Sequence, residues 1–331
     1  MRENNNPQIS VCIPIYNVEN YIEKCLRSVF EQTIAEKAEF ILVDDCSQDQ
    51  SMAVVERITK DYPMIKNQIK IFRHENNKGS AAARNTLLKN TSGKYIIYVD
   101  ADDWCEPDYL EYLYNTAEKN NADIVCCNLW EEHKCFSNRM TFKFPESSVA
   151  CVHQLLIGEL PSWLHIKFVK LSLFRNSAIG FIDKVDLQED FIVSVKLFSN
   201  AQKISYIDNS LYHYNQQNIQ SLSIRKTLSS DKCLQMIESI KEIERFLREK
   251  DTISFYEEDL KKRKILTKIV ILLKVEKRNR KEYYNLYKNE LKKIKNLNLK
   301  FFILRSILRF YDFRLYFIGN FFFSIIRFFK R

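Results

Sequence analysis

Residues 93–104 read G-K-Y-I-I-Y-V-D-A-D-D-W, and this stretch decides the fold. Tyr95–Val99 is a short apolar run of β-branched and aromatic residues, which indicates a buried strand of a parallel sheet. Three carboxylates follow at Asp100, Asp102 and Asp103. Because ligands of open α/β sheets bind at the carboxyl ends of the strands, we expect these carboxylates to project into a crevice.

Carboxylates spaced this closely suggest a bound cation, since they repel one another without one. Mg²⁺ and Mn²⁺ prefer oxygen ligands, and Mg²⁺ usually takes one or two carboxylates together with substrate phosphates. The stretch therefore predicts a site for Mg²⁺ or Mn²⁺ and a phosphorylated ligand. The competing explanation is a helix N-terminus, where Asp is a favoured cap. Asp103 fits that role, with Pro107 close behind it.

The chain before this stretch alternates between two patterns. Apolar runs that predict strands lie at residues 9–15, 40–43 and 69–72. Patterns with helical spacing lie between and after them, at residues 18–32, 51–61 and 81–88. This alternation indicates an α/β fold, in which a mostly parallel sheet is flanked by helices.

Polar residues that suit a nucleotide follow the ends of these strands. Tyr16 can stack on a base, Asp45 can accept a hydrogen bond from a base N–H, and Arg84 can pair with phosphate. Each residue alone is ordinary loop chemistry, whereas their shared position favours a nucleotide site. The full set is Tyr16, Asn17, Asp44, Asp45, Ser47, Asn77, Gly79, Arg84, Asp100 and Asp102.

Four motifs occur in order along this half of the chain. They are P-I-Y-N at 14–17, V-D-D-C-S-Q-D at 43–49, N-N-K-G-S-A-A-A-R-N at 76–85 and Y-V-D-A-D-D at 98–103. Together they resemble the motif set of family 2 glycosyltransferases. The resemblance implies a Rossmann-like GT-A domain, in which the polar set above, with Pro14 and Ala101, binds a nucleotide-sugar. It also implies that Asp100 and Asp102 form the D-x-D metal pair.

The second half of the domain carries the expected catalytic pair. A helix to about residue 119 and a strand at 123–130 precede an irregular stretch and a short helix near 151–158. Residues 164–174 resemble a family element below the acceptor site, in which we expect His165 to be structural. The sequence L-Q-E-D-F-I at 187–192 opens a helix whose acidic first turn suits the helix dipole. The resemblance to the family's G-E-D motif implies that Asp190 is the base and that Glu189 contacts the acceptor.

Two runs at 204–207 and 211–214 predict edge strands. The second opens a segment that resembles the family element closing over the diphosphate, although Asn215 replaces its common arginine. His213 is a candidate third metal ligand, and packing within an aromatic strand is the alternative for it.

The last third of the chain differs in charge from the rest. The chain has 331 residues and a net charge of +9, which is made up of about +14 in residues 226–331 and about −5 before them. Helical patterns cover 228–250, 255–276 and 280–295, and the segment 301–331 is rich in Phe with a narrow polar stripe. Its longest uncharged run is shorter than the roughly 20 residues that span a bilayer. We expect an amphipathic helix in a membrane surface, and packing on the protein's own core is the alternative.

These patterns divide the chain into a nucleotide-sugar-binding half (1–105), an acceptor-binding half (106–225), a basic helical region (226–300) and a membrane-associating tail (301–331). The resemblance implies metal-dependent, inverting sugar transfer to a saccharide acceptor. The nine cysteines have no repeated C-x-x-C spacing, which favours free thiols in a reducing cytosol over disulfides. A lipid-linked acceptor at the inner face of the cell membrane, in cell-surface polysaccharide synthesis, would explain the tail. We expect a cytoplasmic, peripheral protein without a secretion signal and without a nucleic-acid partner.

Two other classes of protein remain open at this point. A nucleotidyltransferase also uses carboxylate-bound metal, but its Gly-, Arg- and Lys-rich first loop is absent from residues 14–17. A nucleic-acid-binding module could use the basic third of the chain, and the salt dependence of binding would distinguish it from a lipid-binding protein.

Overall fold

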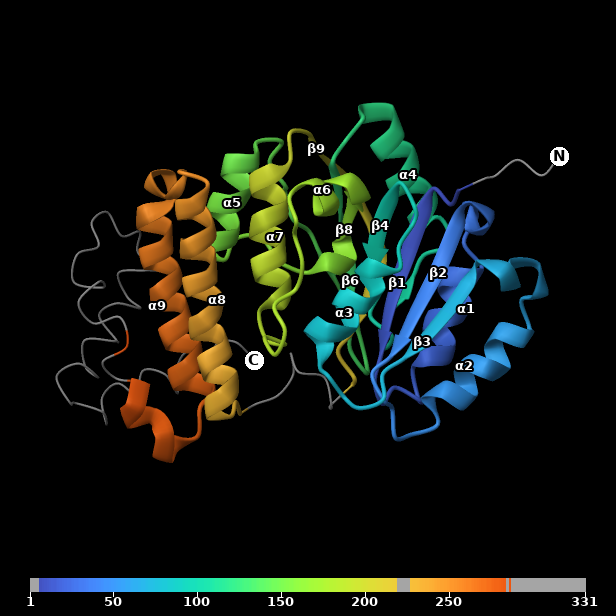
Figure 1. Ribbon diagram of the computed structural model, residues 1–331, viewed down its shortest axis with the longest axis horizontal. Coiled ribbons are helices and arrows are strands. Elements are labelled where there is room, and N and C mark those ends of the chain that lie inside the picture. Colours follow the sequence, from blue (N-terminus) through green and yellow to red (C-terminus); the bar gives the residue numbers. More distant parts are fainter. Residues whose placement is uncertain (1–5, 219–226, 284–285, 287–331) are drawn as a thin grey trace. The chain divides into compact units, whose positions relative to one another are not determined.

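The computed structural model describes residues 6–218, 227–283 and 286 (Figure 1). The chain forms two compact units. Of the described residues, the first contains 6–152 and 160–218, and the second contains 153–159, 227–283 and 286. Each unit is described by itself below.

The first unit is built on a mixed sheet, whose strands in the described residues run in the order β3-β2-β1-β4-β8-β6-β9-β5, with β7 paired to β6. The strand bounds are β1 Ile9–Ile15, β2 Ala38–Asp44, β3 Ile69–Arg73, β4 Tyr95–Tyr98, β5 Trp104–Cys105, β6 Ile124–Glu132, β7 Ser137–Met140, β8 Lys167–Lys170 and β9 Ile204–Asn215.

Strands β3, β2, β1 and β4 are parallel, as the alternating pattern predicted. Every residue of β2 and β4 is buried, which explains the apolar runs Phe40–Val43 and Tyr95–Tyr98 within them. Because the four strands point the same way, their carboxyl ends meet at one edge of the sheet. The polar loops after β1, β2 and β4 therefore lie close together.

Helices flank this sheet, and their apolar spacing explains their positions. In α1, buried residues recur at steps of three or four, and the helix packs against α2 and β5. Helix α3 packs against β1 and β2, and α4 packs against β6 and β9. The helix bounds are α1 Ile22–Phe30, α2 Ser51–Lys60, α3 Ser80–Lys89, α4 Tyr109–Asn120, α5 Ser148–Ile157, α6 Leu171–Asn176 and α7 Glu189–Asn200.

Three expectations for the chain after β4 were wrong. The runs at 204–207 and 211–214 form one strand, β9, which contains an irregular register and lies between β6 and β5 instead of at an edge. The stretch expected to be irregular contains β7, whose exposed polar residues pair with the end of β6. Asp103 does not cap a helix, since α4 begins after Asp108 and no side chain caps it.

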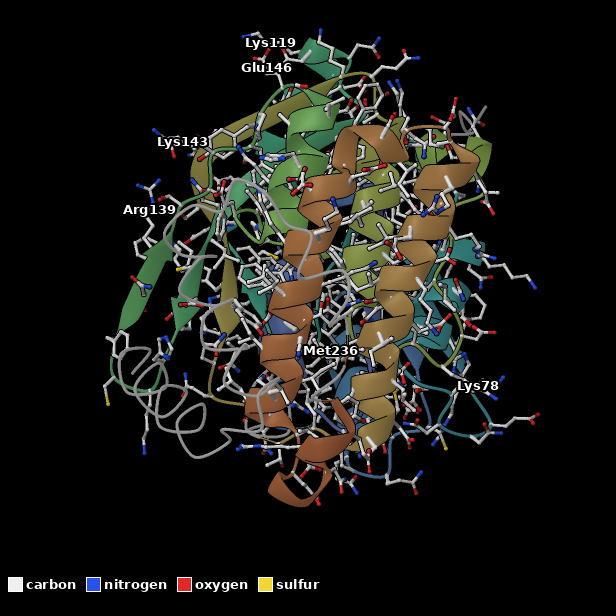
Figure 2. The ribbon with its side chains drawn as sticks, turned by 90° about the vertical axis from the view of Figure 1, so that its left-hand side faces the viewer. Lys78, Lys119, Arg139, Lys143, Glu146 and Met236 are labelled. Atoms are coloured by element: carbon white, nitrogen blue, oxygen red, sulfur yellow. The ribbon has the colours of Figure 1, made fainter. Side chains whose placement is uncertain are left out.

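The described part of the second unit consists mainly of α8 (Ser230–Glu249) and α9 (Glu257–Lys274), which pack side by side (Figure 2). Ser229 caps α8 by accepting a hydrogen bond from the Lys232 backbone N–H. The predicted helix at 280–295 lies largely outside the described residues, and the tail at 301–331 lies wholly outside them. None of the helices that the structure describes is long and apolar enough to cross a membrane.

Candidate active site

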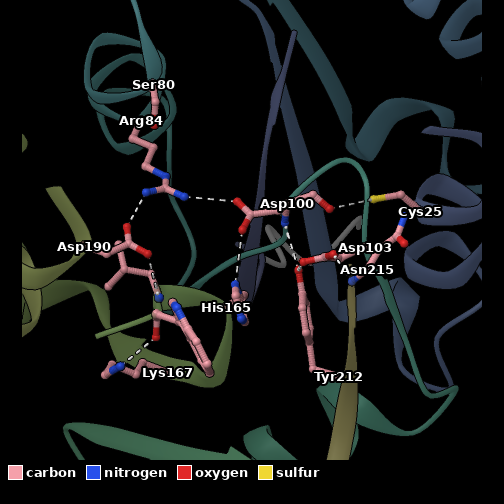
Figure 3. A network of polar contacts seen from close by, with 12 residues as sticks. Cys25, Ser80, Arg84, Asp100, Asp103, His165, Lys167, Asp190, Tyr212 and Asn215 are labelled. Carbon is pink, nitrogen blue, oxygen red and sulfur yellow. Dashed lines mark hydrogen bonds and ion pairs between the residues drawn. The ribbon is translucent and has the colours of Figure 1, made fainter. Parts of the chain in front are cut away.

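The carboxylates after β4 each have a different set of partners, and Figure 3 shows those of Asp100 and Asp103. Asp100 accepts a hydrogen bond of 3.0 Å from Arg84 Nη2 and lies 3.2 Å from His165 Nδ1. Asp103 is buried and accepts from the Tyr212 hydroxyl at 2.7 Å and from the Asn215 backbone N–H at 2.8 Å. Asp102 accepts from the Asn218 amide at 2.8 Å. The three carboxylates thus have different hydrogen-bond partners although they come from one turn.

Burial and mutual repulsion act on the ionisation of this group. Burial raises the pKa of Asp102 and the pKa of Asp103, and the charge of the neighbouring carboxylates adds to both effects. Burial also opposes ionisation of Asp100, but His165 and the charge of Arg84 hold the pKa of that carboxyl below its ordinary value. Additional positive charge at this turn would stabilise all three carboxylates in their ionised form.

Three side chains of the described residues are grouped closely enough to hold a metal ion. Ligand atoms of Asp100, Asp103 and His165 lie within 4.8 Å of one another. The Nε2 atom of His165 is buried and has no hydrogen-bond partner among the residues that the structure describes, and the ring stacks on Tyr212 with centroids 4.3 Å apart. Two carboxylates and an imidazole form a donor set that suits Mn²⁺ and is compatible with Mg²⁺. His165, expected to be structural, is therefore part of the site.

The predicted metal ligands overlap with this group in part. Asp100 belongs to it, whereas Asp102 points toward Asn218. His213 has both ring nitrogens at carboxylates, 2.7 Å from Glu132 and 2.8 Å from Glu106. The metal roles of Asp102 and His213 stay predictions. His165, in contrast, lies close to Asp100 and Asp103.

The predicted catalytic pair lies in the same network, on the first turn of α7. Arg84 Nη1 donates to Glu189 at 3.0 Å and also to Asp190. The second oxygen of Asp190 accepts from the Leu164 backbone N–H at 3.2 Å. Burial and the neighbouring Asp190 raise the pKa of Glu189 to about 7, although the charge of Arg84 opposes the shift. Arg84, predicted to contact phosphate, is in this structure paired with three carboxylates.

The residue before α7 departs from the family's G-E-D motif, because Gln188 stands where the motif has glycine. Gln188 has a φ of +76°, in the left-handed region that favours glycine. The family's glycine would adopt this conformation without strain. Gln188 thus occupies a backbone conformation to which glycine is better suited.

A buried lysine supports the loop beneath Asp190. Lys167 Nζ donates to the carbonyl oxygens of Pro161 at 3.0 Å and Trp163 at 2.6 Å. Burial lowers the pKa of Lys167 to about 8. The sequence singled out this segment but not the lysine, because no local pattern shows that a charged side chain will turn inward.

The predicted nucleotide residues lie where expected, after β1 and β2 and before α3. Asp45 is bonded within the protein, because it accepts from the backbone N–H groups of Lys78 and Gly79 at 2.9 and 2.8 Å. Asp44 likewise accepts from the Ser47 N–H, and the Ser47 hydroxyl accepts from the Asn17 N–H. Tyr16 is 46% exposed and free to stack on a planar ligand.

The remaining members of the predicted set differ in their accessibility. Asn77 is exposed, Pro14 and Gly79 are partly buried, and Ala101 is buried beside the carboxylates. A pocket of about 410 Å³ opens beside Asn17. Its lining residues are Asn17, Glu19, Asn20, Tyr21, Gln48, Asp49 and Asn218. Since Asn218 also bonds Asp102, this pocket adjoins the carboxylates after β4.

Comparison with known proteins identifies the family. The model of glycosyl transferase family 2 matches residues 10–180, which is just over half of the chain. The chain belongs to glycosyl transferase family 2. The match covers the four motifs, the carboxylates after β4 and the loop beneath Asp190.

One curated relative is the poly(ribitol-phosphate) beta-glucosyltransferase of Bacillus spizizenii, which is 32% identical over 208 residues. The match covers 62% of this chain and 32% of the relative. Other curated relatives are also longer, and the chain spans about a third to three fifths of their length.

Two solved structures share the fold. Staphylococcus aureus TarS 1–349, in complex with UDP-GlcNAc, has a TM-score of 0.70 at 22% identity, and the match covers 95% of this chain and 89% of TarS. The mannosyltransferase PcManGT from Pyrobaculum calidifontis, in complex with GDP-Man and Mn²⁺, has a TM-score of 0.57 at 14% identity, with 95% and 86% coverage. The expected GT-A architecture is thereby confirmed.

Proposed function

We propose that this protein is a metal-dependent, inverting glycosyltransferase of cell-surface polysaccharide synthesis. The observation that carries the proposal is the network that joins Asp100 after β4 to Asp190 on α7 through Arg84. A candidate metal carboxylate and a candidate base for an acceptor hydroxyl are thus joined through one arginine. This arrangement occurs on a fold whose family transfers sugars.

The roles of the residues follow from their positions. Asp100, Asp103 and His165 would hold Mg²⁺ or Mn²⁺, with Asp102 as the further ligand that the D-x-D motif predicts. The cation would supply positive charge to the departing diphosphate. Asp190 would take the proton of the acceptor hydroxyl as that hydroxyl attacks the anomeric carbon. Tyr16, which is exposed and directly precedes Asn17 of the pocket lining, would stack on the base of the donor.

The relatives suggest the class of donor and acceptor. UDP-GlcNAc is bound by TarS, and the B. spizizenii relative acts on poly(ribitol-phosphate). A uridine-diphosphate sugar and a surface-polymer acceptor are therefore our first candidates. A lipid-linked acceptor and attachment of residues 301–331 to the inner membrane face complete the proposal, on the basis of the tail's sequence.

A donor screen tests this proposal. Purified protein is incubated with UDP-glucose, UDP-GlcNAc and GDP-mannose, with Mn²⁺ or with excess EDTA, and released nucleoside diphosphate is measured. We expect one of these donors to release nucleoside diphosphate, and we expect EDTA to abolish that release. We also expect Asp102→Asn to reduce it strongly in a folded protein, because an amide carries no charge to attract a cation. Full activity in EDTA would refute the metal requirement, and full activity of the variant would refute the role of Asp102.

A further inference from the structure

Arg84 on α3 contacts both the carboxylate that is predicted to bind the metal and the pair that is predicted to act on the acceptor. Its Nη2 donates to Asp100 at 3.0 Å, and its Nη1 is shared between Glu189, at 3.0 Å, and Asp190. Asp100 comes from the turn after β4, whereas the other two come from the first turn of α7. One side chain therefore connects the predicted metal carboxylate to the predicted base (Figure 3).

The surroundings of Arg84 restrict its movement. The side chain is only 7% exposed, and its guanidinium carbon lies 5.8 Å from the ring of Tyr98 and 5.9 Å from the ring of Phe181. A guanidinium is a planar fork that binds carboxylates in fixed directions, whereas a lysine ammonium is a point charge without that geometry. The fork thus sets both the distance and the orientation between Asp100 and Asp190.

The far oxygens of the two carboxylates are held by another element. Asp100 Oδ2 lies against His165, and Asp190 Oδ2 accepts from the backbone of Leu164, the preceding residue. Arg84 and the segment 164–165 therefore hold the same two carboxylates from opposite oxygens. Removal of Arg84 would leave Asp100, Glu189 and Asp190 close together without their shared cation, and repulsion would move them apart.

We propose that Arg84 is a positioning residue that fixes the base Asp190 relative to Asp100. The inference rests on the glycosyltransferase function proposed above. In that reaction the hydroxyl is deprotonated on one side of the anomeric carbon while the diphosphate departs on the other. A fixed separation of the two groups keeps attack and departure in line, and displacement by about 1 Å can cost roughly 10²-fold in rate.

The first test compares Arg84→Lys with wild type, using UDP-GlcNAc or the donor that the screen identifies in its place. Lysine keeps the charge but loses the fork. We expect kcat to fall about 100-fold, while the donor KM and the Kd for Mn²⁺, measured by electron paramagnetic resonance of free Mn²⁺, change by less than about threefold. A kcat within about threefold of wild type would overturn the proposal. So would a parallel loss of Mn²⁺ binding, since Arg84 would then act only on the metal site.

A matched control is Arg175→Lys on α6, where the arginine makes a hydrogen bond of 2.8 Å to the Thr91 carbonyl and contacts no carboxylate of the site. We expect this variant to retain the kcat of wild type. An equal loss of kcat in the control would show that the Arg84 effect is not specific to the network, and would overturn the proposal.

A double-mutant cycle identifies the group through which Arg84 acts. If Arg84 positions Asp190, Arg84→Lys should reduce kcat little further in an Asp190→Asn background. If kcat of the double variant instead falls by the product of the two single losses, Arg84 acts through another group. If Arg84→Lys fails to fold, Phe181→Leu removes one confining ring and keeps every charge. It should lower kcat at least about threefold with Mn²⁺ binding unchanged, and an unchanged kcat would overturn the proposal.

An unfolding cycle on the same variants separates this inference from the proposed function. Lack of turnover by wild type with every donor would refute the glycosyltransferase assignment. The unfolding equilibrium of Arg84→Lys, Asp190→Asn and the double variant needs no substrate. We expect a coupling of at least about fivefold in the equilibrium constant, and independent effects would overturn the positioning role.

Discussion

Glu189→Gln should make the stability of the protein less sensitive to pH. In the folded protein, burial and the neighbouring Asp190 raise the pKa of Glu189 from 4.5 to about 7. Its side chain is 12% exposed, so solvent screens the effect little. A carboxyl group whose pKa is higher in the folded than in the unfolded protein contributes fully to the free energy of unfolding below its unfolded pKa. That contribution is lost as the pH rises through its folded pKa.

The magnitude follows from the size of the shift. Each pKa unit corresponds to about 1.4 kcal/mol, so wild type loses about 3 kcal/mol from this group between pH 4.5 and pH 8. Glutamine carries no charge at either pH and avoids this loss. The melting temperature of Glu189→Gln should thus rise, relative to wild type, by about 5–10 °C between these two pH values.

Thermal unfolding in EDTA measures this difference, because the chelator prevents a bound cation from stabilising the charged form of Glu189. Glu146→Gln is the control, since Glu146 is exposed and its replacement should leave the pH dependence unchanged. Identical pH dependence of Glu189→Gln and wild type would refute the reasoning. A relative gain confined to pH values below 4.5 would refute it as well, because it has the opposite sign.

Three further predictions concern the base, the loop before α3 and the tail. Asp190→Asn should keep donor binding, measured by calorimetry, and lose about 10²–10⁴-fold in kcat, whereas lost binding with an unchanged kcat would assign it to ligand binding. Gly79→Ala should destabilise the protein by about 1–3 kcal/mol in urea unfolding, because φ is +93° and the new Cβ would lie 2.3 Å from an Asp186 oxygen. Gly180→Ala, whose Cβ would meet its nearest atom at 3.4 Å, should cost less, and equal losses would contradict the argument. Deletion of residues 301–331 should release the protein from anionic vesicles in a flotation assay, while a lowered melting temperature of the remainder would show instead that the tail packs on the core.

The sequence predicted the parallel half of the sheet well, because β1, β2 and β4 are buried apolar runs that differ from their polar loops. It missed β7, whose residues Ser137–Met140 are mostly exposed and polar and form a strand only by pairing with β6. It also predicted two edge strands where β9 is continuous, since an irregular register interrupts the apolar pattern but not the pairing.

The sequence indicated individual candidate residues of the site, but not the contacts that connect them. Resemblance to the family motifs indicated Asp100 and Asp190, whereas the pairing of Arg84 with Glu189 and Asp190 is a contact between residues more than 100 positions apart in the chain. His165 lies among apolar neighbours in the sequence, and only the folding of its segment against β4 brings it to Asp100. Local patterns carry no information about such distant pairs.

The central claim is that this chain transfers a sugar with inversion, and proton NMR of the donor tests it most directly. Purified protein is mixed with Mn²⁺ and an α-linked UDP-sugar from the screen, with water as the acceptor if no saccharide is known. We expect the donor's anomeric signal to decay and the β-anomer of the released or transferred sugar to appear first. Appearance of the α-anomer first would contradict inversion, and no decay of any donor would contradict glycosyl transfer itself.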